Sequence, residues 1–240
     1  MFFANSITNA LSQAITSQEP AMTHEHRNDL IDNPSPRCPV ALVLDTSASM
    51  SGDPINALNQ GAQLFIDEVK GDDLARWSVD LAVYTAGGHA QCLQSFVGIE
   101  QVSGIAPLQA GGATPLGAAV RMALDDLEAR KRTYRGNGVP YYQPWLVIIS
   151  DGAPTDTWED AAQRACELAQ TRKLVSLPVG VAGANMKQLG RFTNKSPVAL
   201  DGLKFREFFL WLSASMARVS ASTSSDAAVQ LPSIDPWGSI

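Results

Sequence analysis

The chain has 240 residues, of which 45% are hydrophobic and 18% are charged, and this globular composition excludes an intrinsically disordered chain. Its 18 basic and 24 acidic residues give a formal net charge of 18 − 24 = −6, which argues against a nucleic-acid groove or an anionic membrane as a partner. The 3 cysteines are widely spaced and form no CxxC pair, so the sequence predicts reduced thiols and neither a disulfide framework nor a zinc knuckle.

Residues 1–36 are polar, and the sequence Asn33-Pro34-Ser35-Pro36 at their end indicates an N-terminal extension before the folded domain. Apolar residues recur there at every fourth position: Phe3, Ile7, Leu11 and Ile15. The extension is therefore expected either to be flexible or to form a short helix that docks on a partner or on the domain. The first basic residue is Arg27, and no apolar run approaches the roughly 20 residues that cross a bilayer. We therefore expect a cytoplasmic protein without a membrane partner.

The patterns of residues 37–220 predict one α/β domain, followed by a loose Ser-rich tail over 221–240. Strands are predicted from apolar runs or alternation at 39–44, 77–85, 92–97, 144–150, 174–181 and 198–200. Helices are predicted from apolar stripes at 55–69, 116–131, 158–172, 186–192 and 205–219. Asp53-Pro54 is expected to supply an N-cap and a first-turn proline. This order implies a mostly parallel sheet with one antiparallel edge strand and helices on both faces.

Oxygen-bearing side chains follow two of the most apolar strands. Asp45, Ser47 and Ser49 come after the first of them, Asp151 follows another, and Thr114 precedes a helix between them. Ligands of such sheets bind beyond the carboxyl ends of the strands. An all-oxygen set suits Mg²⁺, or alternatively Mn²⁺ or Ca²⁺, and suits zinc or copper poorly. With only two carboxylates among the ligands, the ion would remain electrophilic and attract an anionic ligand from outside.

Each of these residues also has a plainer interpretation. The three that follow the first strand could form a polar turn that caps the next helix, although Asp53 is expected to provide that cap. Thr114 could be only the N-cap of its helix, and Asp151 only a turn aspartate. Asp156 is predicted to cap the helix that begins near Trp158 rather than to bind metal.

The motif Asp45-x-Ser47-x-Ser49, followed by Thr114 and by Asp151-Gly152, resembles the metal-ion-dependent adhesion site (MIDAS) of the von Willebrand factor A (vWA) domain family. The resemblance extends over residues 38–220. Two features depart from the family pattern: Ala48 stands where Gly is commoner, and the extension of residues 1–36 precedes the domain. Within the family, the stretches 144–147, 150–158 and 179–182 resemble stand-alone bacterial vWA proteins of the tellurium-resistance (TerY-like) group.

The resemblance implies a Rossmann-like vWA fold and a Mg²⁺ bound directly by Ser47 and Ser49, with Thr114 and the two aspartates acting partly through water. It also implies that a Glu or Asp of a partner protein completes the coordination, so that the domain is a binding module and not an enzyme. The TerY-like group implies a bacterial stress-response, tellurium-resistance-like or phage-defence system with a protein kinase and a phosphatase as partners.

Three other functions were weighed. A haloacid-dehalogenase-type phosphatase would use Asp45 as its nucleophile, but the second Asp that this chemistry needs two residues later is Ser47 here. A nucleotide-binding fold would carry GxGxxG or GxxxxGK[ST] near its first strand, and neither pattern is present there. A purely structural subunit with a vestigial site remains as the third alternative, although the presence of all five residues argues against it.

Overall fold

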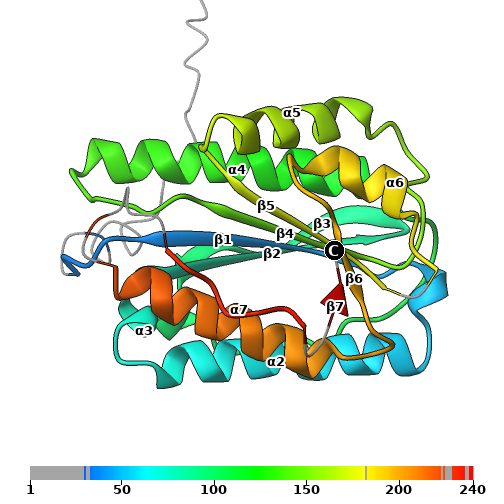
Figure 1. Cartoon of the computed structure of the whole chain (residues 1–240), viewed down its shortest axis with the longest axis horizontal. Helices are drawn as coiled ribbons and strands as arrows, with labels where there is room; N and C mark the ends of the chain where they lie inside the picture. The colour runs from blue at the N-terminus through cyan, green and yellow to red at the C-terminus, as the bar shows by residue number, and fades with distance from the viewer. Residues whose placement is uncertain are drawn as a thin grey trace, which may run out of the picture.

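The structure is a computed structural model that describes residues 30, 33–181, 183–222, 224, 229–235 and 238–239. The helix predicted on Phe3, Ile7, Leu11 and Ile15 lies outside the described residues. A seven-stranded sheet with the order β3-β2-β1-β4-β5-β6-β7 forms the middle layer, with helices on both faces (Figure 1). The predicted α/β class, with a mostly parallel sheet between two helical layers, is confirmed.

The five inner strands, in the spatial order β2, β1, β4, β5 and β6, are parallel. The two edge strands, β3 and β7, run antiparallel to their neighbours. Their bounds are β1 (Cys38–Asp45), β2 (Val79–Gly87), β3 (His89–Gly98), β4 (Trp145–Ser150), β5 (Val175–Gly180), β6 (Val198–Leu200) and β7 (Gly238–Ser239). The antiparallel edge strand that the predicted hairpin required is β3. β7 adds a second one, at the opposite edge.

Part of the C-terminal segment packs on the domain, which differs from the loose tail expected over 221–240. β7 pairs with β6, and the Trp211 indole donates a hydrogen bond of 2.9 Å to the Pro232 carbonyl. A two-residue strand is too short to produce a periodic pattern in the sequence, because alternation needs at least about four residues to be read.

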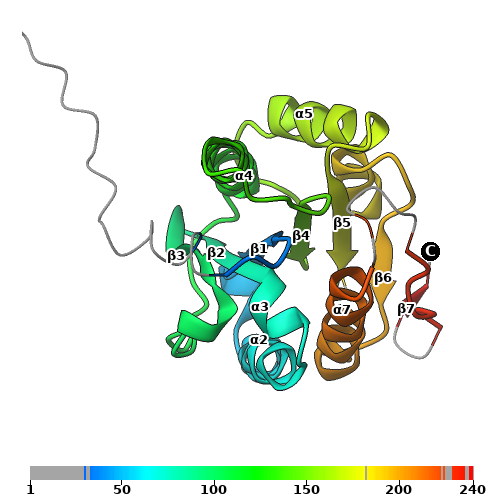
Figure 2. The same cartoon turned by 90° about the vertical axis from the view of Figure 1, so that its left-hand side faces the viewer.

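Two layers of helices cover the sheet. The helices are α2 (Asp53–Gly71), α3 (Ala75–Ser78), α4 (Leu116–Gly136), α5 (Glu159–Gln170), α6 (Met186–Leu189) and α7 (Phe205–Ser220), with 3-10 turns η1 (Ala48–Met50), η2 (Ile99–Gln101) and η3 (Gly190–Phe192). α2, α3 and α7 lie on one face of the sheet, and α4 and α5 lie on the other (Figure 2). This two-sided cover explains why β1 is buried along its whole length.

Two local expectations were wrong. Trp77 was predicted at the start of a strand, but it lies in α3, a single helical turn that precedes β2. Asp53 was predicted as the N-cap of α2, but it is the first residue of that helix, and Gly52 is the N-cap with φ +85°. Asp53 instead places a negative charge in the first turn of α2, where it interacts favourably with the positive end of the helix dipole.

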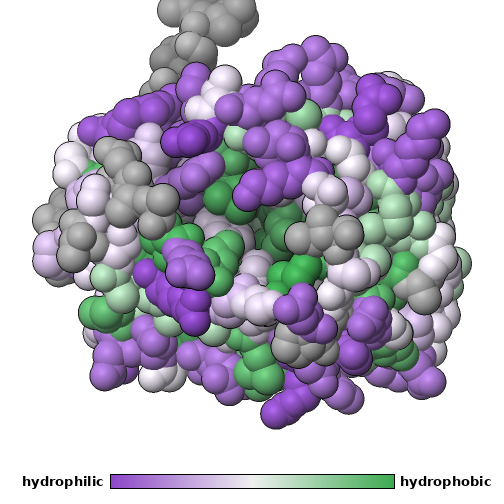
Figure 3. Space-filling model, in the orientation of Figure 1, coloured by the Kyte–Doolittle hydropathy of each residue, from purple (hydrophilic) through white to green (hydrophobic). Residues whose placement is uncertain are grey.

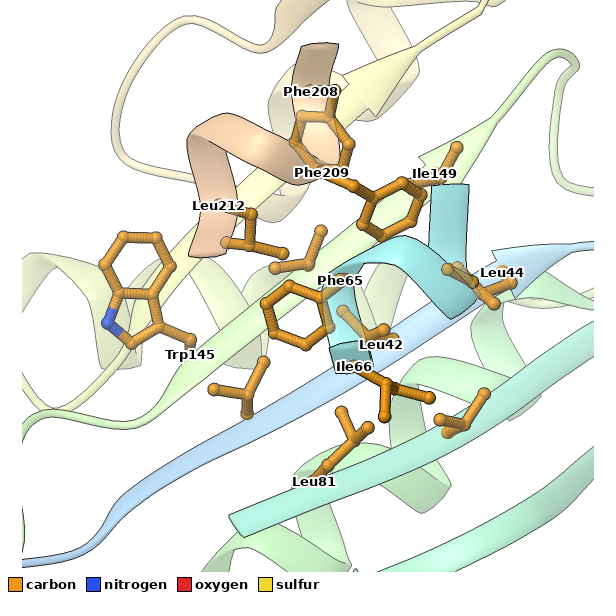
Figure 4. Packing of buried hydrophobic residues seen from close by; sticks show 14 of the residues in the cluster. Leu42, Leu44, Phe65, Ile66, Leu81, Trp145, Ile149, Phe208, Phe209 and Leu212 are labelled. Carbon is orange, nitrogen blue, oxygen red and sulfur yellow. The ribbon is translucent and has the colours of Figure 1, made fainter. Parts of the chain in front are cut away.

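The core between the sheet and the pair α2 and α7 is rich in aromatic residues. Phe65 of α2 and Phe209 of α7 lie with ring centroids 6.1 Å apart, and both belong to the cluster that also contains Leu42 of β1 (Figure 4). Trp145 is 3% exposed and packs in this core, and Trp158 is 9% exposed and packs in the core on the opposite face of the sheet, so both are packing residues, as predicted. Burial of such rings contributes on the order of 2–3 kcal/mol each before entropy is counted.

The outer surface of the helical layers is mainly polar. On the face shown in Figure 3, hydrophilic residues cover most of the area and apolar residues form smaller areas between them. This distribution is expected when helices turn their apolar stripes toward a sheet. Among the described helices, none is both long and apolar enough to cross a membrane.

A buried ionic cluster lies near the amino ends of β1 and β2. Asp80 is 0% exposed and accepts hydrogen bonds from Arg130 and from the Tyr134 hydroxyl, while Arg37 Nη1 lies 3.4 Å from Asp80 Oδ1. Burial disfavours the charged form of Arg130, but the adjacent Asp80 raises the pKa of its guanidinium above the ordinary value. This cluster was not predicted from the sequence, because Arg37, Asp80 and Arg130 lie far apart along the chain.

We predict that Asp80→Asn lowers the free energy of unfolding by about 3–5 kcal/mol, because it removes the carboxylate charge that pairs with the buried Arg130 guanidinium. Urea unfolding measures the loss. Asp67→Asn, at an exposed carboxylate that accepts from Gln63, is the control and should change stability by less than about 0.5 kcal/mol. Equal effects of the two substitutions would contradict the prediction.

Candidate metal centre

The register of β1 and β4 determines where the first predicted ligand lies. Leu44 pairs with Ile149, so Asp45 and Ser150 come next on the two neighbouring parallel strands. The Ser150 hydroxyl donates a hydrogen bond of 2.6 Å to Asp45 Oδ2, and the Ser47 amide donates one of 2.9 Å to Asp45 Oδ1. Asp45 is 0% exposed. Both of its oxygens are therefore held in fixed directions.

A chain of hydrogen bonds joins three more of the predicted residues. The hydroxyl oxygens of Ser47 and Ser49 lie 2.9 Å apart, and the Ser49 hydroxyl donates to Asp151 Oδ1 at 2.8 Å. Ser47 is buried and Ser49 is exposed, so the chain leads from the interior to the surface. The structure thus brings together Asp45, Ser47, Ser49 and Asp151 from two loops that are 102 residues apart in the sequence.

Thr114 is buried in the loop before α4, and backbone hydrogen bonds hold that loop against the other two. The Ala48 amide donates to the Gly112 carbonyl at 3.0 Å, and the Thr155 amide donates to the Thr114 carbonyl at 3.0 Å. The N-cap of α4 is Pro115, so Thr114 does not occupy the capping position considered for it. Its hydroxyl lies in a loop that the Ser47–Ser49 turn and the Asp151 loop both contact.

Sequence reasoning missed two polar residues around these loops. Ser150 is predicted only as the last residue of a strand, although its place directly before Asp151 was a signal that its hydroxyl lies near the site. Asp156 was predicted to cap the helix near Trp158, and that prediction was wrong. Its carboxylate instead accepts from the amides of Gly117 at 3.0 Å and Ala118 at 2.7 Å, in the first turn of α4.

The two carboxylates form an acidic centre without a described counter-charge. Burial raises the pKa of Asp151, and the nearby Asp45 charge raises it further, against the opposing effect of the hydrogen bond from Ser49. In the described part of the chain, neither aspartate forms an ion pair with Lys, Arg or His. Two adjacent carboxylates without a basic partner are an environment that favours a bound cation.

The donor chemistry of the site fits a hard divalent cation. Its two aspartates and three hydroxyl residues supply oxygen alone, which suits Mg²⁺ better than zinc or copper. Within the described ranges, no three His, Cys, Asp or Glu side chains gather around a metal-sized site. A cation here would therefore depend on the serine and threonine hydroxyls. Hydrogen bonds join the Ser47 and Ser49 hydroxyls to each other and to Asp151, and backbone hydrogen bonds hold the Thr114 loop against theirs.

Two close backbone contacts fix the loops around the site. Gly112 has φ +72°, and a Cβ there would collide with the backbone of Gly88. A Cβ at Gly87 would collide with the carbonyl and hydroxyl of Thr46. These contacts bring the turn between β2 and β3 against both the residues after β1 and the loop before α4.

An open, mostly parallel sheet with oxygen-bearing loops beyond its strand ends defines an α/β domain of the class that binds ligands at that edge. The chain belongs to the von Willebrand factor type A domain family, whose profile matches residues 40–206. Domains of this family are generally interaction modules rather than enzymes. A search of curated proteins finds no match.

Solved structures with a similar fold come from several organisms. A von Willebrand factor type A protein from Catenulispora acidiphila has a TM-score of 0.56 at 14% identity, over 76% of this chain and 43% of that one. The ArnB paralog VWA2 from Sulfolobus acidocaldarius has a TM-score of 0.51 at 14% identity, and the match covers 75% of this chain and 45% of that one. The pilus adhesin SpaC from Lactobacillus rhamnosus GG has a TM-score of 0.60 at 14% identity, and the match covers 76% of this chain and 31% of that one. The chain thus spans less than half of each, and the likeness shows the fold alone.

We predict that Gly112→Ala lowers the free energy of unfolding by about 1–3 kcal/mol, because alanine is strained at positive φ and its Cβ meets the Gly88 backbone. Gly111→Ala is the matched control, since a Cβ there meets no described atom within 4 Å. Thermal or urea unfolding of the two variants measures the difference. A loss for Gly111→Ala as large as that for Gly112→Ala would show that the close approach is not the cause.

Proposed function

We propose that this chain is a metal-dependent protein-binding module. In this proposal Asp45, Ser47, Ser49, Thr114 and Asp151 hold Mg²⁺ as an intact MIDAS, with Mn²⁺ or Ca²⁺ as alternatives, and a Glu or Asp carboxylate of a partner protein binds the ion. The observation that carries the proposal is the hydrogen-bonded Ser47–Ser49–Asp151 chain beside the buried Asp45 carboxylate. The bound ion would supply a positive charge that neutral hydroxyls leave partly uncompensated.

The proposed ligands differ in burial, and we propose that their roles differ accordingly. Asp45 is fully buried and held on both oxygens, so its carboxylate would offer the ion a negative charge in a fixed position and would orient the loop after β1. Ser49 is exposed and Asp151 is half-buried, so the ion would lie where a partner side chain can reach it. The same burial of Asp45 argues against its use as a phosphatase nucleophile, because an attacking carboxylate must reach the substrate.

The biological setting is proposed from the TerY-like sequence resemblance. We propose that the module works in the bacterial cytoplasm, in a stress-response, tellurium-resistance-like or phage-defence system with a protein kinase and a phosphatase. Cys38, Cys92 and Cys166 are free, which fits a reducing compartment. The acidic net charge of −6 gives no support for a nucleic-acid partner.

We predict that Asp45→Ala weakens Mg²⁺ and Mn²⁺ binding by more than about 100-fold, because it removes one of the two charged ligands. Isothermal titration calorimetry of the full chain measures the affinity. Asp53→Ala is the matched control, since Asp53 is an exposed carboxylate at the start of α2 and lies outside the hydrogen-bonded cluster. Its variant should bind both ions as the wild type does.

Partner binding should follow the metal. In a pull-down from native lysate with Mg²⁺, read by mass spectrometry, we expect the wild type and Asp53→Ala to retain the same protein, and Asp45→Ala to lose it. EDTA should remove it from all three. A partner that stays bound in EDTA and to Asp45→Ala would defeat the proposed function.

A further inference from the structure

Four hydrogen bonds from one dipeptide join the loop of Asp151 to the loop of Thr114. The Thr155 amide donates to the Thr114 carbonyl, and the Thr155 hydroxyl oxygen accepts from the Thr114 amide, both at 3.0 Å. The Asp156 carboxylate accepts from the amides of Gly117 and Ala118 at 3.0 and 2.7 Å. We call Thr155 and Asp156, with these four bonds, the 155–156 clamp.

The clamp supplies a hydrogen-bond acceptor for the first amides of α4, which the N-cap residue of this helix does not provide. The first amides of a helix need an acceptor, usually the side chain of the N-cap residue. In α4 the N-cap is Pro115, whose side chain carries no acceptor. Asp156 takes over this task from 38 and 39 residues further along the chain, and its charge lies at the positive end of the helix dipole.

The contact between the two loops is too close to admit much rearrangement. A Cβ at Gly117 would lie 2.6 Å from the Trp158 Cα, so the backbones of α4 and the residues before α5 touch directly. On the outer side, Arg121 donates a hydrogen bond to the Thr157 carbonyl at 2.9 Å. The start of α4, and Thr114 just before it, are therefore positioned by the loop that carries Asp151.

We infer that Thr155 and Asp156 are positioning residues of the metal centre, an inference that rests on the proposed function. They fix the Thr114 hydroxyl relative to Asp151 and take no part in coordination themselves. Metal binding and the clamp then support each other, because an ion that binds both Thr114 and Asp151 favours the same approach of the two loops. Loss of the clamp should weaken the ion's binding while the fold persists.

Thr155→Val tests the clamp with little change of shape. Valine matches threonine in size but cannot accept the Thr114 amide, and Thr155 is exposed, so no core packing is lost. We expect Thr155→Val and Asp156→Ala to bind Mn²⁺ about tenfold more weakly than the wild type, as is typical for residues that orient metal ligands. Thr155→Ser keeps the acceptor and should bind as the wild type does.

Asp160→Ala is the control for surface charge, since Asp160 is 61% exposed and accepts from the Arg121 side chain, whereas Asp156 accepts from the amides of α4. Mn²⁺ affinity of the full chain is measured by calorimetry, and thermal unfolding is followed with Mn²⁺ and with EDTA. The stabilisation gained from Mn²⁺ should shrink in Thr155→Val and Asp156→Ala, and should be unchanged in Thr155→Ser and Asp160→Ala.

The outcomes separate the two proposals. If the wild type binds Mn²⁺ and Thr155→Val binds it equally well, the clamp has no positioning role, but the metal-dependent module stands. If Thr155→Ser or Asp160→Ala loses as much affinity as Thr155→Val, the loss reflects general destabilisation, and the inference is wrong. If the wild type binds neither Mn²⁺ nor Mg²⁺, both proposals fail.

Discussion

β1 and β4 lie side by side and parallel at the centre of the sheet, and their register decides which side chains meet at its carboxyl edge. Because Leu44 pairs with Ile149, the residues that follow them, Asp45 and Ser150, become neighbours, and Asp151 comes next to the Ser49 hydroxyl. A shift of one residue would turn Asp45 to the opposite face of the sheet. The hydrogen-bonded cluster, the proposed ion and the proposed partner carboxylate all depend on this pairing.

The acidic side chains at the two ends of the sheet differ in whether basic residues neutralise them. At the amino end, Asp80 is surrounded by Arg37, Arg130 and Tyr134, so its charge is compensated within the protein. At the carboxyl end, Asp45 and Asp151 lie near each other and the pKa of Asp151 is raised. A fold that neutralises Asp80 internally and leaves Asp45 and Asp151 without a described basic partner separates a stabilising cluster from the proposed metal centre.

The sequence allowed the fold class and the meeting of Asp45, Ser47, Ser49 and Asp151 to be predicted for a simple reason: apolar strands before polar turns share one sheet edge when they are parallel. It could not reveal partners set by tertiary structure. Asp156 looks like a local cap, and only the approach of α4 shows that it serves Gly117 and Ala118. Asp80 and β7 were missed for the same reason, since long-range pairing and not periodicity defines them.

The proposed function requires that a divalent cation binds among the side-chain oxygens of the proposed ligands, which are Asp45, Ser47, Ser49, Thr114 and Asp151. Crystals of the full chain grown with Mn²⁺, measured at the manganese absorption edge, test it directly. We expect an anomalous peak in direct contact with the Ser47 and Ser49 hydroxyls, with the Thr114 loop beside it. An anomalous map with no peak there, and with the serine hydroxyls still bonded to each other and to Asp151, would contradict it.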